Sequence, residues 1–124
     1  MENLVIEATK YTPRIDFNVE NNVLRIEGKS TPENTFEFFS PVTAWLNEYF
    51  SQSQTAVMEF NIPYFNSSSS RVMYDIFDIL DKACTNGSSL NVCWKYAKEN
   101  ENGFETGEEF QEDFEDLNIT LMEF

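Results

Sequence analysis

The sequence predicts one α/β domain built on a mixed β-sheet, with an N-terminal hairpin and about three helices. In several short segments apolar and polar residues alternate, as in half-buried strands, whereas in others apolar residues recur at three- and four-residue steps, as in helices. Beyond the hairpin the two kinds of segment alternate, which is typical of parallel strands joined by helices. The chain has 124 residues, of which 41% are hydrophobic, so we expect one core and a single domain over residues 1–124.

The N-terminal part of the chain predicts an antiparallel hairpin. A short strand or edge arm is expected at 4–8, followed by strands at about 14–19 and 23–28. Between the latter two, Asn21 and Asn22 can adopt the positive φ values that a tight turn requires. Because hairpin strands run antiparallel, this pair makes the predicted sheet mixed.

A helix is expected at about 34–52, after a loop at 30–34 that leads into its start. Its apolar side chains recur every three or four residues and define one face, formed by Phe38, Phe39, Val42, Trp45, Leu46, Tyr49 and Phe50. Pro41 is compatible with this helix only near the first turns, and elsewhere it would kink the helix.

The remainder predicts strands that alternate with two further helices. Buried strands are expected at 55–62 and 90–96, and a closing strand is indicated by Ile119, Leu121 and Met122. The first helix follows a serine run and ends at Asn86-Gly87; its apolar face is formed by Val72, Met73, Ile76, Phe77, Leu80, Ala83 and Cys84. The second helix is expected at 104–116, with Phe110, Phe114 and Leu117 facing inward.

Charge and composition exclude several classes of function. Acids number 22 and bases 8, and the net charge of −14 repels nucleic acids and anionic membranes and favours a monomer. Histidine is absent, which removes the commonest general base and the commonest metal ligand. Cys84 and Cys93 lie in apolar patterns, and no segment resembles a signal peptide or a transmembrane helix. We therefore expect a cytoplasmic protein with no cofactor and no metal.

The segment from Asn66 to Ser70 lies between a predicted buried strand and a helix start. At this edge of an α/β sheet ligands tend to bind, and the unpaired N–H groups of a first helical turn favour an anion. Serine and asparagine are also preferred N-cap residues, so the run has a purely structural explanation. The functional alternative is phosphorylation, which adds about −1.5 to −2 charges and three acceptor oxygens.

Several short motifs are distributed along nearly the whole chain. They are Thr12-Pro13-Arg14-Ile15, Gly28-Lys29-Ser30-Thr31-Pro32-Glu33-Asn34, Tyr64-Phe65-Asn66-Ser67-Ser68-Ser69, Met73-Tyr74-Asp75-Ile76-Phe77-Asp78-Ile79-Leu80, Trp94-Lys95-Tyr96 and Gly107-Glu108-Glu109-Phe110-Gln111-Glu112-Asp113. Together these motifs resemble the SiaC family of bacterial regulatory phosphoproteins. The resemblance implies a fold similar to SpoIIAA, the anti-sigma factor antagonist, and to STAS domains generally.

In that family, the Thr or Ser directly after the Asn of this turn is phosphorylated by a dedicated protein kinase, and a PP2C-type phosphatase removes the phosphate. The resemblance implies that Ser67 is the acceptor, with Ser68 as the alternative. It also implies that the kinase or a partner contacts Asn66, Ser68, Ser69 and Arg71. The unphosphorylated form is expected to bind and regulate an effector protein such as a diguanylate cyclase, in cyclic-di-GMP signalling and biofilm regulation.

Acidic residues concentrate at the C-terminal end. Residues 99–124 contain ten acids and no Lys or Arg, which predicts either a solvated helix face or a docking face for a basic partner. Four of these acids are expected opposite the apolar side chains of the last helix: Glu108, Glu109, Glu112 and Asp113. Asp75 and Asp78 are interpreted as the polar edge of a helix rather than as an acid–base pair.

The sequence leaves three functions open. The preferred one is a non-catalytic signalling protein that is switched by reversible serine phosphorylation. In the second, a structural partner subunit, the serine run only caps a helix and the protein binds its partner whatever its phosphorylation state. The third, a small serine hydrolase, lacks both the G-x-S-x-G motif and a histidine base, so we expect no enzymatic activity.

Overall fold

The computed structural model describes residues 1–52 and 54–124, which form six strands and three helices. The strands are β1 (Leu4–Ile6), β2 (Arg14–Asn18), β3 (Val23–Glu27), β4 (Thr55–Asn61), β5 (Ser89–Tyr96) and β6 (Asn118–Glu123). The helices are α1 (Thr35–Tyr49), α2 (Ser67–Thr85) and α3 (Glu101–Asp113). The predicted α/β class, with an N-terminal hairpin and three helices, is confirmed.

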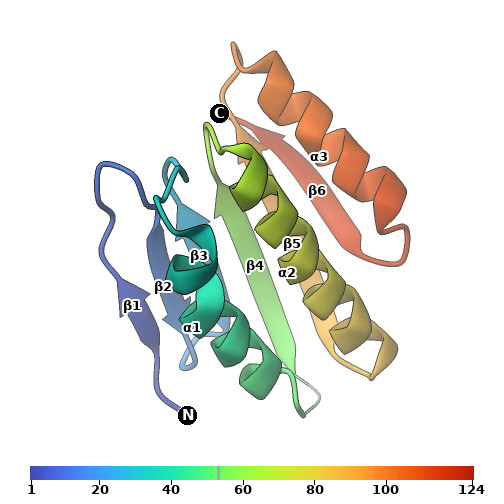
Figure 1. The fold of residues 1–124 in the computed structure, drawn as a ribbon. Helices are drawn as coiled ribbons and strands as arrows, with labels where there is room; N and C mark the ends of the chain where they lie inside the picture. The colour runs from blue at the N-terminus through green and yellow to red at the C-terminus, as the bar shows by residue number, and fades with distance from the viewer. Residues whose placement is uncertain (53) are drawn as a thin grey trace.

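The strands form one sheet in chain order, from β1 to β6. The pairs β1–β2 and β2–β3 are antiparallel, whereas β3–β4, β4–β5 and β5–β6 are parallel. One helix joins each parallel pair, and all three helices lie over the same face of the sheet (Figure 1). When successive β-α-β connections have the same handedness and each new strand is added on the same side of the previous one, their helices all cover the same face of the sheet. The carboxyl ends of β3 to β6 therefore line one edge of the molecule.

The core lies between the sheet and the helices. Side chains alternate along the strands between the two faces of the sheet. The largest of those that face the helices are at most 1% exposed: Phe17, Leu24, Met58, Phe60 and Trp94. The ring of Phe77 on α2 stacks on Phe60, with centroids 5.0 Å apart, and on Phe110 of α3, at 4.1 Å. Trp45 of the first helix is also part of the core, as predicted. Phe77 thus joins the sheet to two helices.

Several element boundaries differ from those that the sequence predicts. The first strand ends at Ile6, and α1 ends at Tyr49 because Phe50 takes the C-cap position. The last helix covers Glu101–Asp113 rather than 104–116, because Asn100 caps it and accepts a hydrogen bond from Gly103 N at 3.0 Å. Pro41 lies inside α1 on its exposed side, and the helix continues past it.

Two predicted turns are present. Asn22 has a φ of 58° and is the single non-glycine residue with positive φ in the described ranges, so of the two asparagines only Asn22 adopts the backbone conformation that was predicted for both. Its side chain also accepts a hydrogen bond from the Tyr49 hydroxyl at 2.7 Å. After α2, Asn86 is the C-cap and Gly87 has a φ of 104°, which confirms the predicted stop.

Neither cysteine takes part in a disulfide bond in the described part of the chain. Cys84 and Cys93 are free, half-buried thiols, and burial raises the pKa of both. Among the described residues, no helix combines the length and the apolar character needed to cross a bilayer.

The sheet face opposite the helices carries an ion-pair network centred on Glu59 of β4. Its carboxylate lies 3.1 Å from Arg25 Nε on β3 and 3.3 Å from Lys95 Nζ on β5. Burial by itself would raise the pKa of Glu59, but the hydrogen bonds and positive charges of Arg25 and Lys95 outweigh burial and hold the pKa below its ordinary value. The network therefore joins three neighbouring strands.

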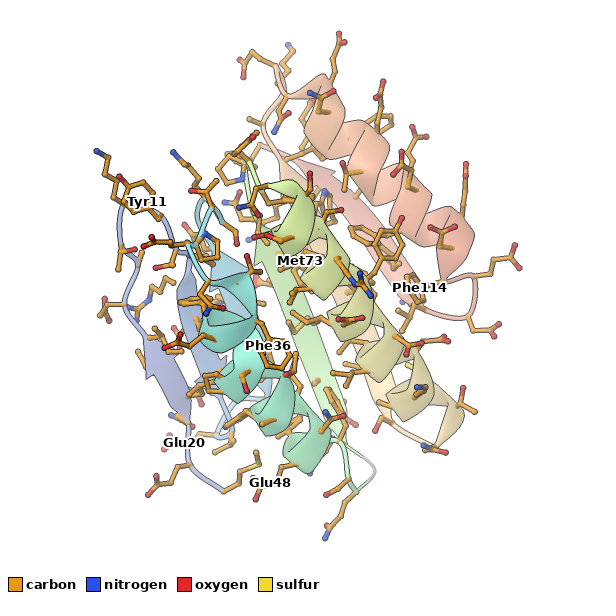
Figure 2. The ribbon with its side chains drawn as sticks, viewed as in Figure 1. Tyr11, Glu20, Phe36, Glu48, Met73 and Phe114 are labelled. Atoms are coloured by element: carbon orange, nitrogen blue, oxygen red, sulfur yellow. The ribbon has the colours of Figure 1, made fainter. Side chains whose placement is uncertain are left out.

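We expect Glu59→Gln to lower the free energy of unfolding by about 1–2 kcal/mol at neutral pH. Because the folded-state pKa is depressed, the contribution is fully present above the unfolded-state pKa of about 4.3 and is lost as pH falls through the folded-state pKa. Urea unfolding should therefore show a difference from wild type near pH 7 that shrinks below about pH 4. Glu20→Gln, at an exposed turn residue (Figure 2), is the control and should match wild type. A difference that stays constant with pH would contradict this account.

Candidate functional site

The serine turn lies at the carboxyl edge of the parallel strands. β4 ends at Asn61 and α2 starts at Ser67, at the top of the sheet in Figure 1. The loop is fixed to the segment after β3, because Ser30 N donates to Tyr64 O at 2.9 Å and Asn66 N donates to Ser30 O at 3.1 Å. The turn is thus held in place on both sides of Phe65 by one residue that is distant in the sequence.

The cap of α2 is Asn66 and not a serine. Its backbone is extended, with φ −79° and ψ 175°, and its Oδ1 accepts a hydrogen bond from Ser69 N at 2.9 Å. This bond satisfies one of the N–H groups that a helix start leaves unpaired. The capping interpretation therefore holds for Asn66, and the serines occupy the first positions of the helix.

The serines of the turn differ in what surrounds their hydroxyl groups. Ser69 is fully buried, and its Oγ lies 2.9 Å from the Oγ of Ser30, which is also fully buried. The Oγ of Ser68 lies 2.7 Å from Thr35 Oγ1 and 3.2 Å from Asn66 Oδ1. Ser70 is half-buried. Among the four serines of this turn, only Ser67 combines an exposed side chain with a hydroxyl that makes no hydrogen bond to a described residue.

The charges around Ser67 favour an added anion. The first turn of α2 contains no acidic residue, and the positive end of the helix dipole lies there. Arg71 is exposed one turn further along, at the i, i+4 spacing that places two side chains on one helix face. Its guanidinium forms no ion pair with any described residue. A phosphate on Ser67 would therefore meet helical N–H groups and an available cation.

The predicted contact residues have different positions in the structure. Arg71 lies on the surface and Ser68 is exposed, although its hydroxyl is bonded to neighbouring residues. Asn66 is half-buried as the cap, and Ser69 is turned fully inward toward Ser30. Of the four predicted contact residues, only Ser68 and Arg71 are therefore exposed to a kinase or partner.

Two aromatic residues near the turn were not identified from the sequence. Phe36 follows Thr35 at the start of α1 and is 81% exposed, and Tyr64 precedes the cap and is 59% exposed. Figure 2 shows Phe36 on the outer side of α1, toward α2. Both lie off the buried faces, and for Phe36 the sequence holds a signal, because this residue does not fit the apolar spacing of its helix. Exposed aromatic side chains are the kind that protein interfaces use as anchors.

We expect the buried pair Ser30 and Ser69 to be energetically coupled. Either Ser30→Ala or Ser69→Ala leaves one buried hydroxyl without a partner, which costs about 1–3 kcal/mol of unfolding free energy. The double variant removes both hydroxyls, so its loss should be smaller than the sum of the two single losses. Urea unfolding of the four proteins measures this coupling, with the exposed Ser40→Ala as a control. Additive losses would show that the hydrogen bond does not stabilise the turn.

The acidic C-terminal residues lie on the outer surface. Glu108, Glu109, Glu112 and Asp113 are exposed, as predicted, and Phe110 beneath them is buried. Tyr74 of α2 donates a hydrogen bond to Asp113 at 2.8 Å, and burial together with that carboxylate raises the pKa of Tyr74 to about 12. No carboxylate between residues 99 and 124 forms an ion pair with a described Lys or Arg, so the prediction of a docking face for a basic partner stays open.

Asp75 and Asp78 of α2 lie in different surroundings. Asp78 lies 3.1 Å from Lys82 Nζ, in an exposed i, i+4 ion pair. Asp75 lines a shallow groove of about 70 Å³ together with Phe36 and Val72. Their interpretation as the polar edge of the helix agrees with this placement. In the part of the chain that the structure describes, no group of three or more acidic or cysteine side chains is placed to hold a metal ion.

Comparison with known proteins gives the same family over almost the whole chain. Residues 6–124 match the model of the SiaC family regulatory phosphoproteins. The chain is 34% identical over 114 residues to an uncharacterised protein of Pseudomonas aeruginosa (strain UCBPP-PA14), covering 91% of this chain and 90% of that one.

Solved structures agree with this result. SiaC of Pseudomonas aeruginosa superposes with a TM-score of 0.92 at 29% identity, and the match covers 100% of both chains. A chain in the crystal structure of the diguanylate cyclase SiaD in complex with its activator SiaC, also from Pseudomonas aeruginosa, superposes with a TM-score of 0.92 at 30% identity. That match covers 98% of this chain and 99% of the other.

Proposed function

Because the chain belongs to the SiaC family of regulatory phosphoproteins, we propose that it is a non-catalytic signalling protein that is switched by reversible phosphorylation of Ser67. The observation that supports this most is the state of the serine hydroxyls. The Ser67 side chain is exposed and its hydroxyl makes no hydrogen bond to a described residue, whereas the hydroxyls of Ser68 and Ser69 are bonded to residues outside the turn. We treat residues 1–124 as one regulatory domain.

The proposed partner is a diguanylate cyclase. SiaC of Pseudomonas aeruginosa is the activator of the cyclase SiaD, and this chain shares its fold along nearly its full length. Phe36, which follows Thr35 at the start of α1, and Tyr64, which precedes the turn, provide exposed aromatic side chains near Ser67. We propose that the unphosphorylated protein docks with this surface on the cyclase in the cytoplasm and activates it, and thereby regulates biofilm formation.

The phosphate would act through charge and hydration. It adds about −1.5 to −2 charges at the centre of the docking surface, and burying that charge in an apolar contact is unfavourable. Arg71 and the helix N-terminus would hold the phosphate in place. We propose that a protein kinase adds the phosphate and that a PP2C-type phosphatase removes it, so that the two enzymes set the fraction of active protein.

A cyclase assay tests the proposed activity. Purified diguanylate cyclase from the same genome is incubated with GTP, with and without this protein, and cyclic-di-GMP is measured. The proposal predicts a rise in rate that saturates with protein concentration and falls when Ser67 is phosphorylated. A cyclase that binds the protein equally well in both phosphorylation states would support the alternative of a structural subunit, in which the hydroxyl contacts of Ser68 and Ser69 only fix the turn. No binding and no activation would contradict both.

A further inference from the structure

The hydroxyl of Thr35, at the start of α1, is held against the second serine of the turn. Thr35 is 8% exposed, and its Oγ1 lies 2.7 Å from Ser68 Oγ. Ser68 has a single hydroxyl proton, which it donates to Asn66 Oδ1 at 3.2 Å. The Thr35 hydroxyl must therefore donate its own proton to Ser68 Oγ. Both the proton and a lone pair of the Ser68 hydroxyl are engaged by neighbouring side chains.

Phosphoryl transfer requires a serine oxygen that is free to reach the phosphate. A bond forms between Oγ and the γ-phosphorus of ATP, the bond from that phosphorus to ADP breaks, and the hydroxyl proton passes to a base of the kinase. Before it could react, Ser68 would have to give up its bonds to Thr35 and Asn66. Ser67 has no such bond to give up within the described ranges, and its side chain is exposed.

A phosphate on Ser68 would also separate two packed helices. Thr35 belongs to α1 and Ser68 to α2, and their contact joins residues 33 positions apart in the sequence. The oxygen that would carry the phosphate lies within hydrogen-bond distance of the buried Thr35 side chain, so the phosphate would push α1 away. A phosphate on Ser67 points to solvent and leaves the contact intact.

We propose that Thr35 is a positioning residue that restricts phosphorylation to Ser67 by engaging the hydroxyl of Ser68. This inference rests on the proposed phosphorylation switch, and it identifies a residue that determines which serine is phosphorylated. The determinant is a residue of another helix and not the order of serines along the turn.

The substitutions at Thr35 separate this role from a merely structural one. Thr35→Ala removes the hydroxyl and leaves room for Ser68 to rotate toward solvent, so we expect phosphate on Ser68 to rise about fivefold, the factor that corresponds to one net hydrogen bond. Thr35→Ser keeps the hydroxyl and should retain the wild-type pattern. Thr43→Ala is the matched control, because the Thr43 hydroxyl donates only to carbonyls of its own helix, those of Phe39 and Ser40.

The experiment maps phosphate within residues 64–71 by tandem mass spectrometry, on full-length protein isolated from its own host. Each Thr35 variant is examined alone and together with Ser67→Ala, and thermal unfolding confirms that each variant folds. We expect Ser67→Ala to carry little phosphate on Ser68 while Thr35 is intact, and the double variant Ser67→Ala/Thr35→Ala to carry about fivefold more on Ser68.

Two outcomes distinguish this inference from the function on which it rests. Phosphate on Ser67 of the wild-type protein, together with an amount on Ser68 that does not depend on Thr35, would overturn the inference and leave the switch in place. A wild-type protein without phosphate on either serine would overturn the switch, and the inference with it.

Discussion

Ser67→Asp is expected to weaken binding to the cyclase at least tenfold, a loss of about 1.4 kcal/mol in binding free energy. The carboxylate lies at the exposed start of α2, close to the aromatic side chains of Phe36 and Tyr64. If those rings are buried in the complex, the new charge must lose water without gaining a partner. Isothermal titration calorimetry of the purified proteins measures the change.

Two control variants separate the position of this charge from its presence. Ser67→Ala removes the hydroxyl without adding charge and should bind as wild type does. Asn47→Asp adds the same charge at an exposed site near the other end of α1, and it should change the affinity less than twofold. If Asn47→Asp weakened binding as much as Ser67→Asp, net charge and not the serine turn would control the interaction.

Gly107→Ala is expected to lower the free energy of unfolding by about 2–3 kcal/mol, although alanine normally stabilises a helix by about 1 kcal/mol relative to glycine. An added Cβ would lie 2.6 Å from Leu121 Cδ2 and 2.7 Å from Trp94 Cδ1. Trp94 is 1% exposed, and its Nε1 donates to Gly103 O at 2.9 Å, so its indole has little freedom to move away. The absence of a side chain at this position lets α3 approach the sheet.

Urea unfolding measures this effect. Glu109→Ala, on the exposed side of the same helix, is the control and should stay within about 0.5 kcal/mol of wild type. A Gly107→Ala protein that is more stable than wild type would show that α3 can shift outward at little cost. It would also show that its contact with β5 and β6 is not tightly packed.

Local patterns predicted most of the fold. The alternation of apolar and polar residues predicted the strands, the three- and four-residue spacing of apolar residues predicted α1 and α2, and Asn22 has the positive φ predicted for the hairpin turn. The predicted start of α3 was wrong because the helix begins after Asn100, whose side chain accepts a hydrogen bond from Gly103 N. Glycine disfavours a helix, so the first turn is a weaker sequence signal than the apolar residues further along. Sequence periodicity identifies the buried face of a helix better than it identifies the ends.

The site was predicted only in part, since its key contacts are long-range. The serine turn and Asn66 could be recognised within one short segment. The hydroxyl partner of Ser69 is Ser30, which lies 39 positions away in the sequence. The partner of Ser68 is Thr35, which lies 33 positions away. Only the parallel sheet and the packing of α1 on α2 bring these residues together. Such contacts produce no periodic pattern of apolar residues that a single sequence could reveal.

The position of phosphate within residues 64–71 tests the central claim most directly. The protein would be isolated from its own host under several growth conditions, digested and sequenced by tandem mass spectrometry. The account predicts a single phosphate on Ser67 in a fraction of the molecules that changes with conditions. Phosphate only on Ser68, Ser69 or Ser70, or none under any condition, would contradict it.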